Sequence, residues 1–137
     1  MRREPVVQSL AAALVAPYPP EVEAHLEYVA ADPYAVRLVL GTRCALNEPP
    51  VTWVFARQLL LDGLDTVAGL GDVRVWPRTP ERTALELRSA DCCAVVDIET
   101  AGIRAFLGRS LRRVPSGAEG RLIDWQAVVA ELLGRRA

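Results

Sequence analysis

His25 stands between two carboxylates, Glu23 and Glu27, at alternate positions of the chain. Alternate residues of a β-strand project from one face, so these three side chains could converge as an acid–base group or as metal ligands. A solvated polar strand face has the same pattern and is far commoner. We therefore interpret the three residues as a solvent-facing row rather than as a catalytic or metal site.

Three cysteines, Cys44, Cys92 and Cys93, give an odd count without the C-x-x-C spacing of zinc sites and redox motifs. Cys92 and Cys93 are adjacent, so in a strand they point to opposite faces and cannot act as a pair. We interpret both as small buried hydrophobic residues. With no Ser-His-Asp or Cys-His arrangement to assemble, the sequence predicts no enzyme, no cofactor and no metal.

The segment VAGLGDVRVWP, residues 67–77, looks at first like a phosphate-binding loop because it holds Gly69, Gly71 and Asp72. Such a loop works because backbone amides converge on the phosphate and a helix begins directly after them. Here alternating β-formers follow, and the segment has neither a third glycine nor a GK[ST] ending. We predict that these glycines turn the chain into a strand.

The 137 residues, of which 51% are hydrophobic, predict one domain spanning 1–137. The net charge of −1 gives no overall attraction to nucleic acid or to anionic lipid. The C-terminal part, residues 99–137, is nevertheless basic, with seven arginines against four acidic residues. No apolar run approaches the ~20 residues that span a bilayer. The odd cysteine count gives no disulfide framework, so we expect a protein of the reducing cytoplasm.

Alternating hydrophobic residues predict strands rather than helices over most of the chain. We expect the first apolar run, residues 6–14, to be a strand and not the core of a signal peptide. The predicted strands are 6–14, 22–28, 34–40, 51–56, 72–77, 82–89 and 91–98.

Three helices complete the predicted α+β fold of twisted antiparallel sheets. A short helix follows the strand 51–56 and is stopped by Gly63. Two more end the chain: the first crowds Arg109, Arg112 and Arg113 at its C-terminus, where the helix dipole favours cations, and the second begins at an Asp124 N-cap. The residues predicted to be largely buried are Val22, Leu26, Tyr28, Val51, Trp53, Phe55, Val73, Val75, Leu85, Leu87, Ile103, Phe106, Val128 and Leu132.

Surplus apolar residues indicate a surface for a partner. Leu59, Leu60 and Leu61 are consecutive and span more than half of a helix circumference, so we expect them not to share one core. Strand alternation places Arg74 and Trp76 on the face opposite Val73 and Val75. The predicted partner-binding residues are Arg57, Leu60, Leu61, Arg74 and Trp76.

Three segments in this order and spacing, ADPYAV (31–36), TWVFARQLLLDGL (52–64) and GDVRVWP (71–77), resemble the signature blocks of the SsgA-like sporulation and cell-division proteins of filamentous actinobacteria. The resemblance is close over 22–77 and holds in outline over 78–137. It implies a non-enzymatic adaptor that helps to position or support the FtsZ ring at the septum, through contacts with FtsZ or with another SsgA-like protein.

The same resemblance implies a fold similar to the Whirly-type single-stranded nucleic-acid-binding proteins, and a homotrimer. Self-association also fits QLLL (58–61) and DCCAVV (91–96), which offer apolar surface on more than one side. The alternative function is therefore single-stranded nucleic-acid binding by the basic C-terminal part. It is less favoured, because such binding needs stacking aromatic residues, and Phe106 and Trp125 lie on apolar helix faces.

Overall fold

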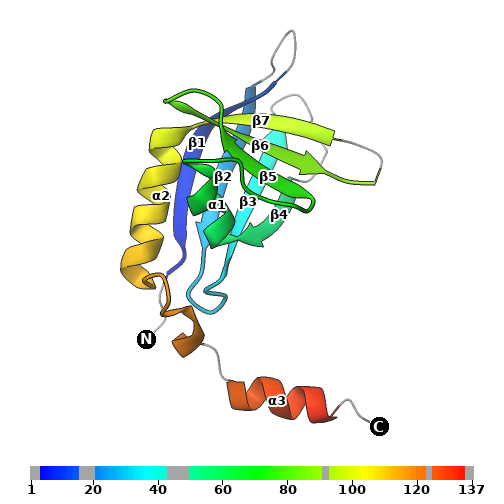
Figure 1. Ribbon diagram of the computed structural model, residues 1–137, viewed down its shortest axis with the longest axis vertical. Coiled ribbons are helices and arrows are strands. Elements are labelled where there is room, and N and C mark those ends of the chain that lie inside the picture. The colour runs from blue at the N-terminus through cyan, green and yellow to red at the C-terminus, as the bar shows by residue number, and fades with distance from the viewer. Residues whose placement is uncertain (1–3, 16–20, 43–49, 91–92, 123–124, 135–137) are drawn as a thin grey trace.

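A computed structural model of the chain describes residues 4–15, 21–42, 50–90, 93–122 and 125–134. Seven strands form one sheet in the order β4-β3-β2-β1-β7-β6-β5, and each pairing is antiparallel (Figure 1). The strands are β1 (Val6–Leu14), β2 (Glu21–Tyr28), β3 (Ala35–Thr42), β4 (Val51–Ala56), β5 (Val73–Pro77), β6 (Arg82–Arg88) and β7 (Cys93–Glu99). The antiparallel fold and all seven predicted strands are confirmed, but the strands form one continuous sheet.

The helices lie where the sequence predicts them. They are α1 (Arg57–Gly63), α2 (Thr100–Arg113) and α3 (Trp125–Gly134), with a short 3-10 helix η1 (Glu119–Leu122) between the last two. Figure 1 shows α2 running alongside β1, and α3 extending away from the sheet.

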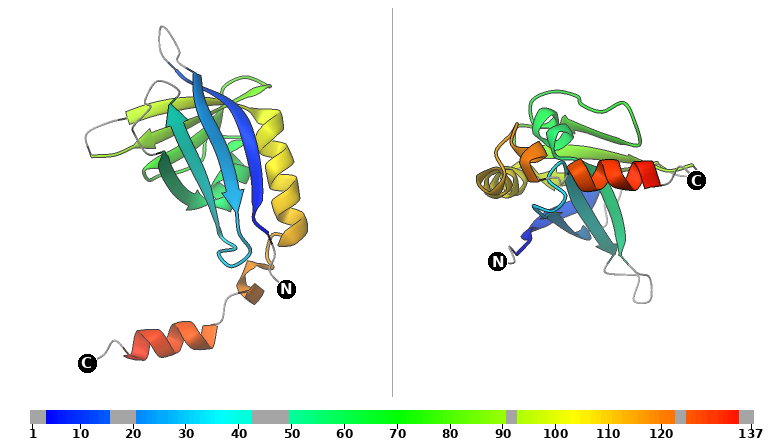
Figure 2. Two further views of the ribbon diagram at one scale, coloured as in Figure 1. Left: turned by 180° about the vertical axis from the view of Figure 1, so that it is seen from behind. Right: turned by 90° about the horizontal axis from the view of Figure 1, so that it is seen from below.

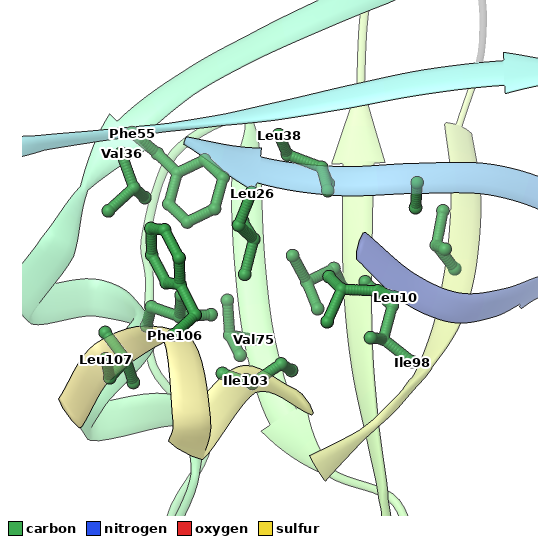
Figure 3. Close-up of a cluster of buried hydrophobic side chains, with 14 of the residues drawn as sticks. Leu10, Leu26, Val36, Leu38, Phe55, Val75, Ile98, Ile103, Phe106 and Leu107 are labelled. Atoms are coloured by element: carbon green, nitrogen blue, oxygen red, sulfur yellow. The ribbon is translucent and has the colours of Figure 1, made fainter. Parts of the chain in front are cut away.

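The sheet twists so strongly that its two ends face each other, with β2, β3 and β4 behind β5, β6 and β7 (Figures 1 and 2). The core fills the space between these halves, where Leu26 and Leu38 from one half meet Val75 and Ile98 from the other (Figure 3). α2 closes one side of this core with Ile103, Phe106 and Leu107, which are all buried.

α1 packs against β5 at unusually short range. A Cβ atom placed on Gly63 would lie 2.3 Å from Cγ1 of Val75 and 2.4 Å from its Cβ. Gly63 is the last residue of α1, so the helix ends where the sequence predicts, although its φ is not positive. Its role is to let the helix backbone reach the strand.

Most of the predicted core is confirmed, with two exceptions among the described side chains. Val51 is 56% exposed, because it begins the edge strand β4. Leu132 of α3 is 60% exposed, and its neighbours Val129 and Leu133 are 52% and 56% exposed. The apolar pattern of α3 therefore does not mark a face that the sheet of the same chain covers. The predicted N-cap Asp124 and the side chains of Trp125 and Val128 lie outside the described parts.

The prediction that Cys93 is buried is wrong. Cys93 is a free, exposed thiol, because it is the first residue of β7, where the sheet ends. Cys44 and Cys92 lie outside the described residues.

Candidate functional site

β5 presents two side chains to the outside of the sheet, as the sequence predicts. Val73 and Val75 are 7% and 0% exposed and face the core, so Arg74 and Trp76 alternate to the outer face, where both are half-buried. β5 is an edge strand and pairs on one side with β6, where Arg74 lies opposite Glu86 and Trp76 opposite Ala84.

Neighbouring side chains hold this outer face in place. Ala84 is fully buried although it alternates outward, so the larger side chains beside it cover it. Asp97, next to Ala84 in the sheet, forms ion pairs with both Arg78 and Arg82 of the β5–β6 hairpin; its Oδ1 accepts a hydrogen bond from Arg82 Nε at 2.6 Å. The hairpin is therefore pinned to β7 beside Trp76.

The glycine-containing segment forms a loop that pairs with the free edge of β5. Ala68 and Val75 exchange two backbone hydrogen bonds of 2.8 and 2.9 Å. Gly69 follows with a φ of 105°, which L side chains rarely adopt, and turns the chain back into β5. This confirms that the glycines lead into a strand.

Two apolar side chains of this loop are open to solvent. Val67 is 58% exposed and Leu70 is fully exposed. The antiparallel Ala68–Val75 pair brings Val67 opposite Trp76 in register, on the outer side of β5. We call Val67, Leu70, Arg74 and Trp76 the β5 surface.

Sequence reasoning missed Val67 and Leu70. The signal that could have found Leu70 is its place between Gly69 and Gly71, in a segment too rich in turn formers to be buried.

Two of the predicted partner-binding residues are not on the surface. Arg57 is 2% exposed and Leu60 is 0% exposed, so the prediction that they form a docking surface is corrected. Leu61 is half-buried and packs against the core, as does Leu59. The three leucines can share one core because the strongly twisted sheet brings both of its edge strands, β4 and β5, into contact with α1.

Arg57 joins α1 to the C-terminal end of α2. Its Nη1 donates hydrogen bonds to the carbonyl oxygen of Ser110 at 3.2 Å and to Ser110 Oγ at 3.5 Å. Its Nη2 lies 3.6 Å from Glu119 Oε2, and its guanidinium lies 4.8 Å from the centre of the Tyr28 ring. Arg57 thus acts as a structural tie between distant segments.

Glu119 and Tyr28, the two ionisable neighbours of Arg57, have shifted pKa values. Hydrogen bonds from the backbone amides of Glu119 and Gly117, together with the Arg57 charge, hold the pKa of Glu119 below its usual range. Burial raises the pKa of Tyr28, against the opposing effect of Arg57. The Tyr28 hydroxyl donates a hydrogen bond to the carbonyl oxygen of Pro33 at 2.9 Å.

The row of His25 and its carboxylates shows no metal-binding geometry. His25 Nε2 lies 2.9 Å from Glu27 Oε1, and both side chains are about one-third exposed. Within the described ranges, no group of three His, Cys, Asp or Glu side chains could hold a metal ion. In the same part of the chain, no helix is long and apolar enough to cross a membrane.

Residues 22–119 match the family model described as "Streptomyces sporulation and cell division protein, SsgA". The chain belongs to this family. Among its relatives is the sporulation-specific cell division protein SsgB of Salinispora tropica, which is 42% identical over 118 residues, covering 84% of this chain and 82% of that protein. The SsgB of Frankia casuarinae is 38% identical over 138 residues, covering 97% and 94%.

A solved structure of the SsgA family has the same fold. The crystal structure of the SsgA-like sporulation-specific cell division protein from Thermobifida fusca superposes with a TM-score of 0.82 at 32% identity, and the match covers 96% of this chain and 98% of that one. The antiparallel sheet and its helices are therefore those of the SsgA family.

Proposed function

We propose that this protein is a non-enzymatic adaptor of sporulation-specific cell division that helps to position or support the FtsZ ring at the septum. A role in sporulation-specific cell division is supported by membership of the SsgA family and by relatives that carry this name. The mode of action is protein–protein contact, made in the cytoplasm with FtsZ or with another SsgA-like protein.

The β5 surface is the observation that carries the proposal of a docking site. It combines a Trp and an Arg, which are favoured at interaction hot spots, with the exposed apolar side chains of Val67 and Leu70. Edge pairing with Ala68 and the ion pairs of Asp97 fix the backbone beneath these side chains, so little ordering is needed on binding. Of the residues first predicted, Arg74 and Trp76 remain the proposed contacts, whereas Leu61 packs against the core and is not part of the β5 surface.

Self-association, as a homotrimer, is part of the proposal. Its support is α3, where Val129, Leu132 and Leu133 are more than half exposed. An isolated helix of ten residues is marginal in water, so a neighbouring molecule that covers this face would stabilise it.

Co-sedimentation of the purified protein with FtsZ polymers tests the function. We expect the protein to appear in the pellet in a saturable manner, with no comparable binding of a single-stranded oligonucleotide at the same salt concentration. Absence from the pellet at all protein concentrations would contradict the proposal. Tight, salt-sensitive oligonucleotide binding would instead support the nucleic-acid alternative.

A further inference from the structure

α2 is a strongly cationic helix in a protein that is almost neutral. Residues 100–113 contain four arginines, Arg104, Arg109, Arg112 and Arg113, and no acidic residue. The inner side of α2 joins the core through Ile103 and Phe106, so the arginines lie on its outer side, toward solvent and the start of β1.

Two of these arginines are held in place by β1 and by the residues just before it. Arg109 Nη1 donates a hydrogen bond to the carbonyl oxygen of Val7 at 2.9 Å and another to Gln8 Oε1 at 3.4 Å. Arg113 Nη1 donates to the carbonyl oxygen of Glu4. These acceptors are uncharged, so the two guanidinium groups are positioned without being neutralised.

The contacts also modify the interpretation drawn from the sequence. Arginines at the end of a helix complement its dipole, but Arg109 bonds to β1 and Arg113 to Glu4 before it, instead of to the last carbonyls of α2. Among the described residues, Arg112 is exposed and forms no hydrogen bond or ion pair. The dipole alone therefore does not account for three arginines here.

Arg109, Arg112 and Arg113 line one hollow of about 450 Å³, together with Val6. In the described chain, no carboxylate lies within ion-pair distance of any of the three. Each planar guanidinium group can bind one carboxylate in a bidentate manner. Three of them side by side therefore favour a ligand with two or more negative charges. We call these three arginines the arginine pocket.

We propose that the arginine pocket binds the carboxylates of an acidic segment of a partner protein. A protein segment fits better than a nucleic acid, because no aromatic side chain lines the pocket and the nearest one on α2, Phe106, is fully buried. The pocket lies on the α2 side of the molecule, whereas the β5 surface faces outward from the sheet. The proposal therefore adds a second contact surface to the adaptor.

Fluorescence anisotropy with a labelled ten-residue polyglutamate peptide tests the proposal on the full chain. The informative variant is Arg112→Gln, which removes one pocket charge and no internal hydrogen bond. The matched control is Arg104→Gln, which removes the same charge from an exposed position of the same helix outside the pocket. We expect peptide affinity to fall about fivefold in Arg112→Gln and less than about twofold in Arg104→Gln.

Three outcomes would overturn the proposal. Equal weakening by both variants would show that the peptide senses only net charge. A single-stranded oligonucleotide that binds more tightly than the peptide and loses affinity in Arg112→Gln would assign the pocket to nucleic acid. No binding of the peptide by the wild type, at low salt and with intact folding by circular dichroism, would exclude an acidic ligand. The proposal rests on the adaptor function, but FtsZ co-sedimentation is measured separately. Failure of the arginine pocket can therefore be told apart from failure of the proposed function.

Discussion

The guanidinium of Arg57 donates a hydrogen bond to the carbonyl oxygen of Ser110 at 3.2 Å, linking the first residue of α1 to the last turn of α2. The backbone amide of Arg57 donates to the carbonyl oxygen of Tyr34 at 2.8 Å. One residue thus fixes α1 against both the β2–β3 turn and α2. Because α1 packs on β5 at Gly63, this tie also sets the position of the strand that carries the β5 surface.

Replacing Arg57 should destabilise the fold. We expect Arg57→Ala to lower the free energy of unfolding by about 3 kcal/mol, since it leaves a cavity and removes the partner of Glu119. Arg57→Met restores most of the volume and should cost about 1 kcal/mol less. Urea denaturation monitored by circular dichroism measures both. A stability unchanged in Arg57→Ala would show that Arg57 is not a structural tie.

The Glu119 carboxylate should make the fold sensitive to acid. Its pKa is lowered in the folded protein, so its contribution to stability is complete above the ordinary pKa of a glutamate, about 4.3, and is lost as the pH falls through the lowered value. Glu119→Gln should therefore be less stable than the wild type at pH 7, and the difference should shrink toward pH 3. Urea midpoints at four pH values test this. A difference that stays constant with pH would contradict it.

The contact between Gly63 and Val75 leaves no room for a methyl group. Gly63→Ala should lower the free energy of unfolding by about 2 kcal/mol, as overpacking of a core does. Gly71→Ala is the control, because nothing lies within 4 Å of a Cβ at that position and its φ is not positive. Equal thermal midpoints for the two variants would mean that α1 can move away from β5.

Period-two patterns predicted the sheet because each strand buries one face. Val22, Leu26, Val73 and Val75 are inside for this reason. The burial of Arg57 could not be predicted, because the residues that compensate it, Ser110 and Glu119, lie far along the chain. An arginine without a visible partner is assigned to solvent by default.

The apolar face of α3 shows what a hydrophobic pattern cannot predict. The helical pattern predicts that Leu132 is buried, yet it is 60% exposed in the single chain. A pattern within one chain cannot tell whether the covering surface belongs to the same molecule. Similarly, the sequence assigns Leu60 and Leu61 to a partner because three consecutive leucines span more than half of the circumference of a helix, more than one flat sheet covers. The sheet is not flat, and its curvature depends on the whole strand order.

α3 should be needed for assembly but not for folding. We expect light scattering to give three times the monomer mass for the wild type and a smaller assembly for the double variant Leu132→Glu, Leu133→Glu, because both side chains are more than half exposed in one chain. Tyr34→Glu, at another exposed position, is the control and should remain trimeric. A monomeric wild type at micromolar concentration would contradict the trimer.

The β5 surface is tested most directly by the affinity of matched variants for FtsZ polymers. We expect Trp76→Ala and Arg74→Glu each to weaken co-sedimentation about thirtyfold, which corresponds to about 2 kcal/mol. Tyr34→Ala, which removes an aromatic side chain of 48% exposure from the β2–β3 turn, should bind as the wild type does. If folded Trp76→Ala and Arg74→Glu both retain wild-type affinity, the β5 surface is not where this protein meets FtsZ.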